Sequence, residues 1–261
     1  MNKPVFAWTF FLCLLALTQV TWAQQADDTL TATPNRPSLS NGAATTQLGA
    51  LELEYGFNHT AQDGGSHTRD FGTSLRYGLT RRADLFWNFS EYQSSIDQGV
   101  RLNGTGDNWL GGRYRFLDQS KSRPAMAVLY LCKVPTASPS KGLGSGYADH
   151  QFVLILSKDL GPIHIDFNQF ALVSGTSHGH DLTGVASFST SGPIYKKLGW
   201  NVETYGGRNG SLHFASQMTA LTLAVRPRLV LDAEIDNGLT PGSPHSRLAA
   251  GFTYTLGRIR K

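Results

Sequence analysis

Apolar and polar residues alternate in short stretches of this chain, and the clearest case is a pair of stretches at residues 71–79 and 84–90. In each, Phe, Leu, Tyr or Trp occupy one parity and small or polar residues the other, with Phe86 as the single misfit. Side chains of a strand point alternately to its two faces, so the pattern predicts strands with one apolar and one polar face. The polar residues 80–83 between them predict a tight hairpin turn.

The same alternation recurs along the chain and predicts about twelve strands. Connections after odd-numbered strands are the longer ones, with polar loops at residues 93–104 and 135–147, whereas residues 191–193 form a tight turn after an even-numbered strand. Long outer loops, short inner turns and an even strand count are typical of outer-membrane barrels, a rule that ten or fourteen strands would also satisfy. The predicted strands are residues 51–57, 71–79, 84–90, 110–116, 125–134, 149–158, 163–168, 181–190, 200–203, 221–225, 229–236 and 248–256.

The placement of charge separates a membrane barrel from a soluble all-β protein. Charged residues fall on the parity opposite the apolar face, so the polar side would line the lumen, whereas a lipocalin-like barrel is apolar inside. A strand of about 11 residues spans roughly 36 Å, and a tilt near 45° reduces this to about 25 Å, the height of the apolar band. We therefore predict an all-β fold, a transmembrane up-and-down antiparallel β-barrel of the bacterial outer membrane type.

Residues 1–23 have the pattern of a secretory signal peptide. Lys3 precedes an almost wholly apolar stretch, and small residues lead to an expected cleavage after Ala23. A membrane-anchoring helix is the alternative, but the apolar stretch is short, and Cys13 within it is not a lipoprotein site. The expected location is the cell outer membrane, with outer-membrane lipid as a partner and the assembly machinery as a transient one.

Composition narrows the function classes further. The formal net charge is +4 and the basic residues do not gather into a patch, so no nucleic acid partner is expected. Only Cys132 remains after cleavage, so an internal disulfide is excluded. No later segment approaches the roughly 18 unbroken apolar residues of a membrane helix. We expect a monomer that needs no cofactor.

The mature chain divides into three parts. Residues 24–46 are polar and lack a strand pattern, residues 47–257 form the barrel, and residues 258–261 are a basic tail. For about twelve strands the lumen is roughly 10–14 Å wide, so a modest segment could block it. We predict that the first part folds into the lumen as a plug and that Arg36 meets a carboxylate cluster there. A mobile periplasmic tail is the alternative.

The inward parity of the predicted strands supplies the candidate site residues. Acidic side chains gather where the first and last strands would meet, and arginines lie on the second and fourth strands. The predicted charged residues that line the lumen are Glu52, Glu54, Arg76, Arg113, Arg115, Asp166, Glu203, Asp232, Glu234 and Asp236.

Several short motifs resemble one known family. Residues 104–116, GTGDNWLGGRYRF, resemble the G-x-G-D-x-x-L-G-x-x-Y-R-hydrophobic motif of the bacterial outer-membrane family labelled for the "MetA-pathway of phenol degradation". Residues 35–37 (NRP), 75–80 (LRYGLT) and 134–136 (VPT) are similar to other parts of that family. The resemblance implies a transporter-type barrel that passes small, hydrophobic or aromatic molecules. The chain departs from the usual outer-membrane ending, because residues 256–261 lack a terminal aromatic residue.

Enzymes that modify lipids share this architecture and are the main alternative, together with a barrel that does not conduct. Such an enzyme needs a nucleophile beside a base. His164 is the one histidine predicted on a lumen-facing strand position, beside Asp166 and Asn168, and the sequence identifies no serine partner for it. Two histidines in residues 177–181 are too few ligands for a metal site. We therefore predict a small-molecule channel without catalysis or bound metal.

Overall fold

The computed structural model describes residues 30–97 and 99–259. The predicted signal peptide, residues 24–29 and the end of the basic tail lie outside the described residues. In the unit that begins at Thr31, the regular secondary structure of the described residues is β-strand apart from two three-residue 3-10 turns, η2 (Asp63–Gly65) and η3 (Pro139–Lys141). Within the described ranges, no helix has the length and apolar character needed to cross a membrane.

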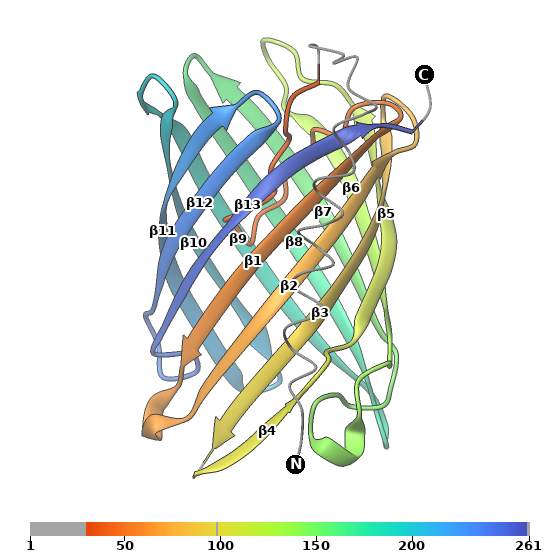
Figure 1. Ribbon diagram of the computed structural model, residues 1–261, viewed down its shortest axis with the longest axis vertical. Coiled ribbons are helices and arrows are strands. Elements are labelled where there is room, and N and C mark those ends of the chain that lie inside the picture. The colour runs from red at the N-terminus through yellow and green to blue at the C-terminus, as the bar shows by residue number, and fades with distance from the viewer. Residues whose placement is uncertain (1–29, 98, 260–261) are drawn as a thin grey trace, which may run out of the picture. The chain divides into compact units, whose positions relative to one another are not determined.

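The described residues of this unit form thirteen strands, and twelve of them make a closed antiparallel ring (Figure 1). Each ring strand pairs with its neighbours along the chain, and β1 closes the ring against β13 over its whole length. The short β4 pairs only with the end of β3. The strands are β1 (Ala50–Ala61), β2 (His67–Gly78), β3 (Ala83–Asp97), β4 (Val100–Gly104), β5 (Asn108–Leu117), β6 (Ala125–Val134), β7 (Asp149–Leu160), β8 (Ile163–Thr176), β9 (Gly179–Tyr195), β10 (Leu198–Asn209), β11 (Leu212–Arg226), β12 (Leu229–Gly238) and β13 (Ser246–Arg258).

The predicted fold class is confirmed, and so is the parity of the strands. Large apolar side chains such as Leu85, Trp87 and Phe152 point outwards and are 45–51% exposed, as the lipid-facing side of a barrel requires. The buried set inside the ring is rich in charged and hydroxyl side chains. Phe86, the misfit in the alternation, is on the inner face and only 6% exposed.

Some predicted loops are wrong, because the strands continue beyond the apolar band. The sequence predicts a loop at residues 93–104, but this range contains the end of β3 and the whole of β4. The turn predicted at residues 191–193 lies inside β9, and the chain reverses instead at Lys196 and Lys197. Apolar alternation marks only the part of a strand that faces lipid, whereas the backbone hydrogen-bond ladder extends past it.

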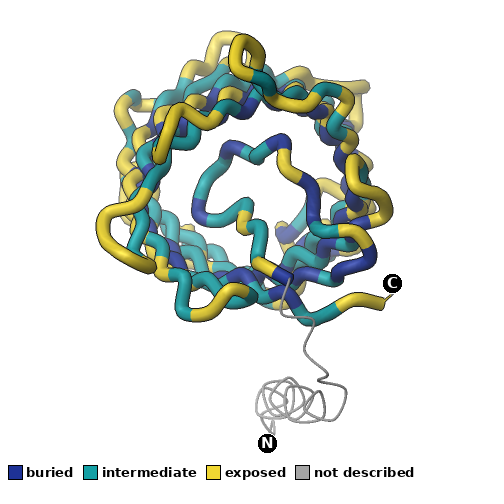
Figure 2. The backbone as a smooth tube through the Cα atoms, turned by 90° about the horizontal axis from the view of Figure 1, so that it is seen from above, coloured by how far each residue is buried: buried dark blue, intermediate teal, exposed yellow. Residues whose placement is uncertain are grey.

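Residues 31–47 run inside the ring and are named the inner segment here. Figure 2 shows the segment inside the ring, and Figure 1 shows it entering and leaving at the end where β1 begins and β13 ends. It has no strand of its own, and its first ladder contact with the wall is the isolated bridge between Leu48 and Gly78 that follows it.

A closed ring should survive mild detergent and unfold only on heating. We expect the protein to migrate faster on a gel when unheated than when boiled, because the intact barrel is more compact than the unfolded chain. A single mobility under both conditions would contradict the closure of β1 on β13.

Candidate functional site: the barrel lumen and the inner segment

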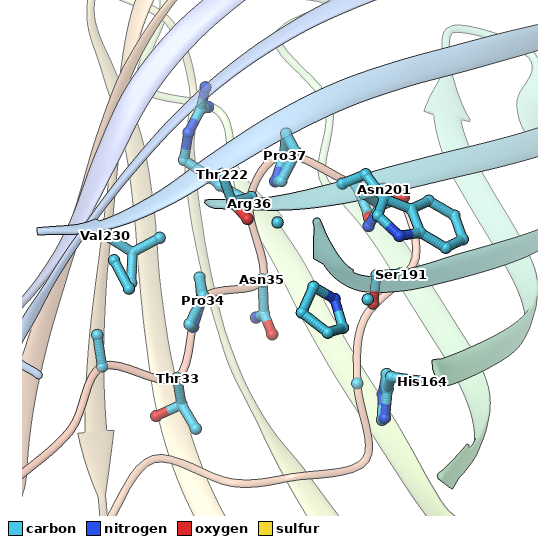
Figure 3. Close-up of a pocket in the computed structure, with 18 of the residues that line it drawn as sticks. Thr33, Pro34, Asn35, Arg36, Pro37, His164, Ser191, Asn201, Thr222 and Val230 are labelled. Atoms are coloured by element: carbon cyan, nitrogen blue, oxygen red, sulfur yellow. The ribbon is translucent and has the colours of Figure 1, made fainter. Parts of the chain in front are cut away.

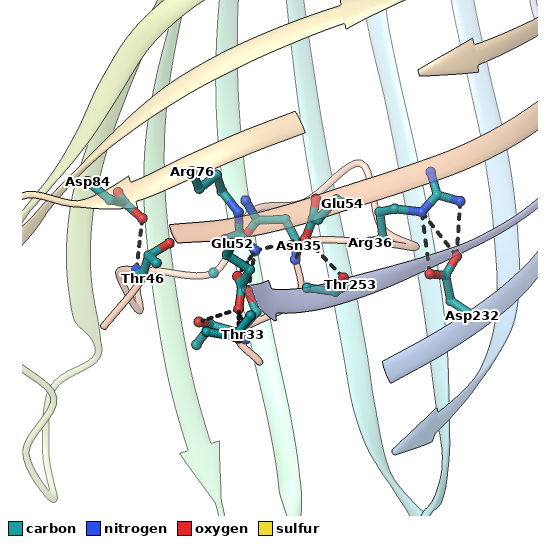
Figure 4. Close-up of polar contacts among 12 residues, drawn as sticks. Thr33, Asn35, Arg36, Thr46, Glu52, Glu54, Arg76, Asp84, Asp232 and Thr253 are labelled. Carbon is teal, nitrogen blue, oxygen red and sulfur yellow. Dashed lines mark hydrogen bonds and ion pairs between the residues drawn. The ribbon is translucent and has the colours of Figure 1, made fainter. Parts of the chain in front are cut away.

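Side chains of the lumen bind the backbone of the inner segment. Glu52 and Glu54 on β1 accept hydrogen bonds from the backbone amides of Thr33 at 2.8 Å and Asn35 at 2.7 Å (Figure 4). A buried backbone amide needs an acceptor, and this segment finds its acceptors in side chains instead of a neighbouring strand. Further bonds of this kind join Leu39 and Ser40 to Glu203 (2.8 and 2.7 Å), Asn41 to Asn168 (2.8 Å), Ala43 to Ser157 (2.7 Å) and Thr46 to Asp84 (2.9 Å).

Arg36 reaches from the inner segment to the acidic wall. Its Nη2 atom lies 3.0 Å from Oδ1 of Asp232 on β12, and its Nε atom lies 3.2 and 3.3 Å from the two carboxylate oxygens (Figure 4). The guanidinium lies over Gly56 on β1 and Gly251 on β13, which are paired across the seam of the ring. Arg36 therefore connects the inner segment to both strands of the pair that closes the ring, β1 and β13.

Other arginines hold lumen carboxylates from the wall itself. Arg76 on β2 is fully buried; it forms an ion pair with Glu52 and another at 2.8 Å with Glu54, and it donates to the carbonyl of Thr33. The sequence predicts that Arg36 meets an acidic cluster, but other arginines bind much of that cluster. Among its members, only Asp232 forms an ion pair with Arg36 in the described structure.

Arg113 on β5 makes the second such pair, with Asp84 on β3. Its Nη2 and Nε atoms lie 2.6 and 3.1 Å from the two carboxylate oxygens, and Nη1 donates to the carbonyl of Gly42 at 2.6 Å. The ring of Phe86 lies between Arg113 and Arg76, at 5.3 and 6.0 Å from their guanidinium carbons. Two parallel bonds to one carboxylate fix the orientation of the arginine and also pair its charge.

The lumen face of β6 to β8 carries an apolar cluster. Leu129 on β6, Ile155 on β7 and Phe170 on β8 are buried in one cluster, and Leu39 and Ala43 of the inner segment pack against it. This cluster lies across the lumen from the carboxylates on β1, β10 and β12, and polar side chains such as Ser157, Asp166 and Asn168 share its strands. The inner segment contacts both sides of the lumen.

A cavity of about 490 Å³ remains between the inner segment and the ends of β8 to β12 (Figure 3). Its lining includes Asn35, Arg36, Ser191 and Asn201. His164 also lines it, with ring nitrogens 2.6 Å from Asp159 and 3.2 Å from Asp166.

The structure places most predicted lumen residues on the inner face and separates one. Nine of the ten are less than 9% exposed inside the ring. Arg115 instead lies at the rim, where it contacts Asp118 at 3.0 Å and the carbonyl of Arg81 at 3.0 Å. The turn after β5 begins there, so the side chain reaches loop backbone instead of the lumen.

Sequence analysis missed several lumen residues that share the inward parity. Asp84 receives both Arg113 and the inner segment, and Arg247 on β13 pairs with Glu234 at 3.0 Å and Asp236 at 3.4 Å. Arg247 has the same parity as the small inward residues of its strand, so the pattern contained this signal. In the part of the chain that the structure describes, no group of three or more histidine, cysteine or acidic side chains is placed to hold a metal ion.

Comparison with known proteins gives a fold and no family assignment. No family model matches the sequence, and no curated protein matches it. An outer membrane channel from Pseudomonas putida F1 is similar in structure, with a TM-score of 0.65, 14% identity, and coverage of 85% of this chain and 99% of that one. The translocator domain of the autotransporter NalP from Neisseria meningitidis has a TM-score of 0.50 at 9% identity, covering 78% of this chain and 88% of that one. The CymD monoaromatic hydrocarbon channel has a TM-score of 0.47 at 9% identity, covering 82% of this chain and 90% of that one.

Removal of Arg76 should cost much more stability than removal of an exposed arginine. Arg76→Ala leaves Glu52 and Glu54 without their buried cation, so we expect the free energy of unfolding to fall by about 3–5 kcal/mol. Arg82 and Asp118 are both about half exposed, so Arg82→Ala is the matched control and should change stability by about 0–1 kcal/mol. Urea titration of the folded fraction in lipid vesicles measures the free energy of unfolding of both variants. Equal losses of stability would contradict a stabilising role for the buried ion pairs of Arg76.

Proposed function

We propose that this protein is an outer-membrane channel for small molecules, and that the inner segment narrows its lumen. The observation that carries the proposal is a closed ring with a charged lumen, crossed by a segment that no strand pairing ties to the wall. A barrel with a filled apolar interior would be a rigid structural element, whereas a polar interior favours water and solutes. The described start of β1 and end of β13 lie at one end of the ring, which we assign to the periplasm.

The inner segment is held in a way that allows release. Its contacts with the wall are mainly side-chain hydrogen bonds, each worth about 0.5–1.5 kcal/mol, or about 1.5–3 kcal/mol where a charged group takes part. Water in the lumen can replace such bonds one by one. The strand ladders of the ring do not include the segment, so its departure would leave the barrel wall intact.

The mixed lining of the lumen suggests the kind of solute. The apolar cluster on β6 to β8 would contact a hydrophobic or aromatic body, and the carboxylates on β1, β10 and β12 would select against anions. This agrees with the hydrophobic or aromatic cargo that the motif resemblance implies. The similarity of fold to an outer membrane channel supports the barrel part of the proposal. We also propose that the protein is a monomer, that it passes such solutes, and that it belongs to the family whose motifs it resembles.

Deleting part of the inner segment should open the lumen. Removal of residues 24–41 is expected to raise single-channel conductance roughly twofold or more, because an extended chain occupies much of a lumen about 10–14 Å wide. Arg36→Ala should raise it by a smaller factor, since one anchor of several is lost.

The matched control replaces residues 31–41 by glycine and serine at the same length. This variant keeps the chain but loses its anchors, so its current should fluctuate between the wild-type and deletion levels. Equal conductance of wild type and deletion would refute the narrowing of the lumen. Absence of conductance in every variant would favour a structural barrel.

An enzyme is the second candidate, and His164 is the residue on which it depends. Both ring nitrogens of His164 face carboxylates, and Ser191 lies opposite it in the β8–β9 ladder. A general base needs a nitrogen directed at the nucleophile, and this arrangement provides none. We expect no release of fatty acid from phospholipid vesicles by wild type. Hydrolysis that His164→Ala abolishes would establish the enzyme instead.

A further inference from the structure

The guanidinium of Arg36 occupies a seat built from three strands. The seat consists of Gly56 on β1, Gly251 on β13 and Asp232 on β12; Gly251 is the direct cross-strand partner of both other residues. A Cβ atom added to Gly251 would lie 2.7 Å from Nε of Arg36, and one added to Gly56 would lie 2.7 Å from Nη2. A larger residue at Gly56 would therefore displace the guanidinium, and one at Gly251 would meet the carbonyl oxygen of Tyr55 as well as Arg36.

The seat is matched to a planar cation. Two adjacent glycines leave a bare stretch of wall on which a flat group can lie, and the Asp232 carboxylate at its edge is 2% exposed. Both carboxylate oxygens accept from Arg36. Guanidinium presents its donors in a fixed planar fork, and a lysine ammonium does not. Shape and charge together thus select one chemical class.

A column of acidic side chains leads along β12 from the far end of the lumen to the seat. Asp236 and Glu234 lie on the same face as Asp232, and all three are less than 9% exposed. Arg247 pairs with the first two, which leaves Asp232 to the inner segment. Carboxylates along one wall attract cations to that wall.

The inner segment combines a cationic and an apolar side chain, and each contacts a part of the lumen that suits it. Arg36 places a cation on the acidic wall, while Leu39, three residues on, packs against the apolar cluster of β6 to β8. The Arg36 side chain is 19% exposed, so its position can be reached from the lumen space beside it.

We propose that this seat is an exchangeable recognition site for small organic cations that carry a guanidinium or amidinium group on an apolar body. Such a solute takes the place of Arg36 when the inner segment withdraws; this step rests on the proposed channel function. A tethered group has an effective concentration of millimolar order, so a free solute competes with it at comparable concentrations. A solute that binds with a dissociation constant of about millimolar order can still leave the seat, as passage through a channel requires.

The test restores the missing group from solution. Arg36→Ala vacates the seat, and methylguanidinium is the probe, titrated by calorimetry into the full-length variant in detergent. We expect saturable binding to Arg36→Ala and weaker binding to wild type, in which the probe must compete with Arg36 for the seat. Binding should weaken about tenfold or more when Asp232→Asn is added, because a charged hydrogen-bond partner is lost.

Gly56→Ala combined with Arg36→Ala is the matched control for shape. It retains every charge of the lumen that Arg36→Ala has but fills the seat, so it should lose binding to a similar degree. The faster mobility of unheated protein checks that each variant folds. If the variant with Asp232→Asn fails this check, the Gly56→Ala combination carries the test alone.

Two readouts separate this inference from the channel itself. Equal binding of methylguanidinium to all three variants, or none to Arg36→Ala, would overturn the recognition site and leave conductance unaffected. In planar bilayers, millimolar methylguanidinium should reduce the current of Arg36→Ala more than that of either double variant. Binding with the expected dependence in a protein that never conducts would support the seat and overturn the channel.

Discussion

The structure depends on one constraint, that every backbone amide and carbonyl facing lipid must find a partner within the protein. A sheet with free edges cannot meet this requirement in a membrane, so the strands close into a ring. The closing contact is the antiparallel pairing of β1 with β13, which runs from Ala50 to Ala61 on one side. Outward alternation of large apolar side chains follows from the same geometry, and so does a lumen sealed from lipid.

The inner segment obeys the same rule by a different route. It lies in an enclosed space without a strand to pair with, and side chains of the wall accept most of its hydrogen-bonded amides; the amide of Ala32, which donates to the carbonyl of Pro227, is an exception. Glu203 illustrates the arrangement, because its two carboxylate oxygens receive the amides of Leu39 and Ser40 and the hydroxyl of Ser40. Buried carboxylates are costly without partners. The segment and the acidic wall therefore stabilise each other.

Strand positions could be predicted from the sequence because an alternation of period two also assigns the faces. That assignment puts Glu52, Asp232 and Glu234 on the inner face, and all three are buried there. The lengths of the strands were harder to predict, because β3 and β9 continue into polar sequence that carries no apolar signal.

Partners were hardest to predict, because they depend on register. Arg76 lies beside Glu52 on the neighbouring strand, which the alternation alone does not reveal. The pairing of Gly56 with Gly251 is likewise invisible in a list of 28 glycines, although it decides where Arg36 can lie. The inward parity of Asp84 and Arg247 was present in the pattern, but nothing in the sequence indicated that these residues would receive charged partners.

The position of Arg36 at the seam has a consequence for the order of folding. Its neighbours come from the first strand and from the last hairpin, and 196 residues separate it from Asp232. Contacts between such distant residues form after local ones, because loop closure costs entropy. The seam must therefore be joined before Arg36 can settle, so the first described part of the chain to be synthesised is the last to reach its native place.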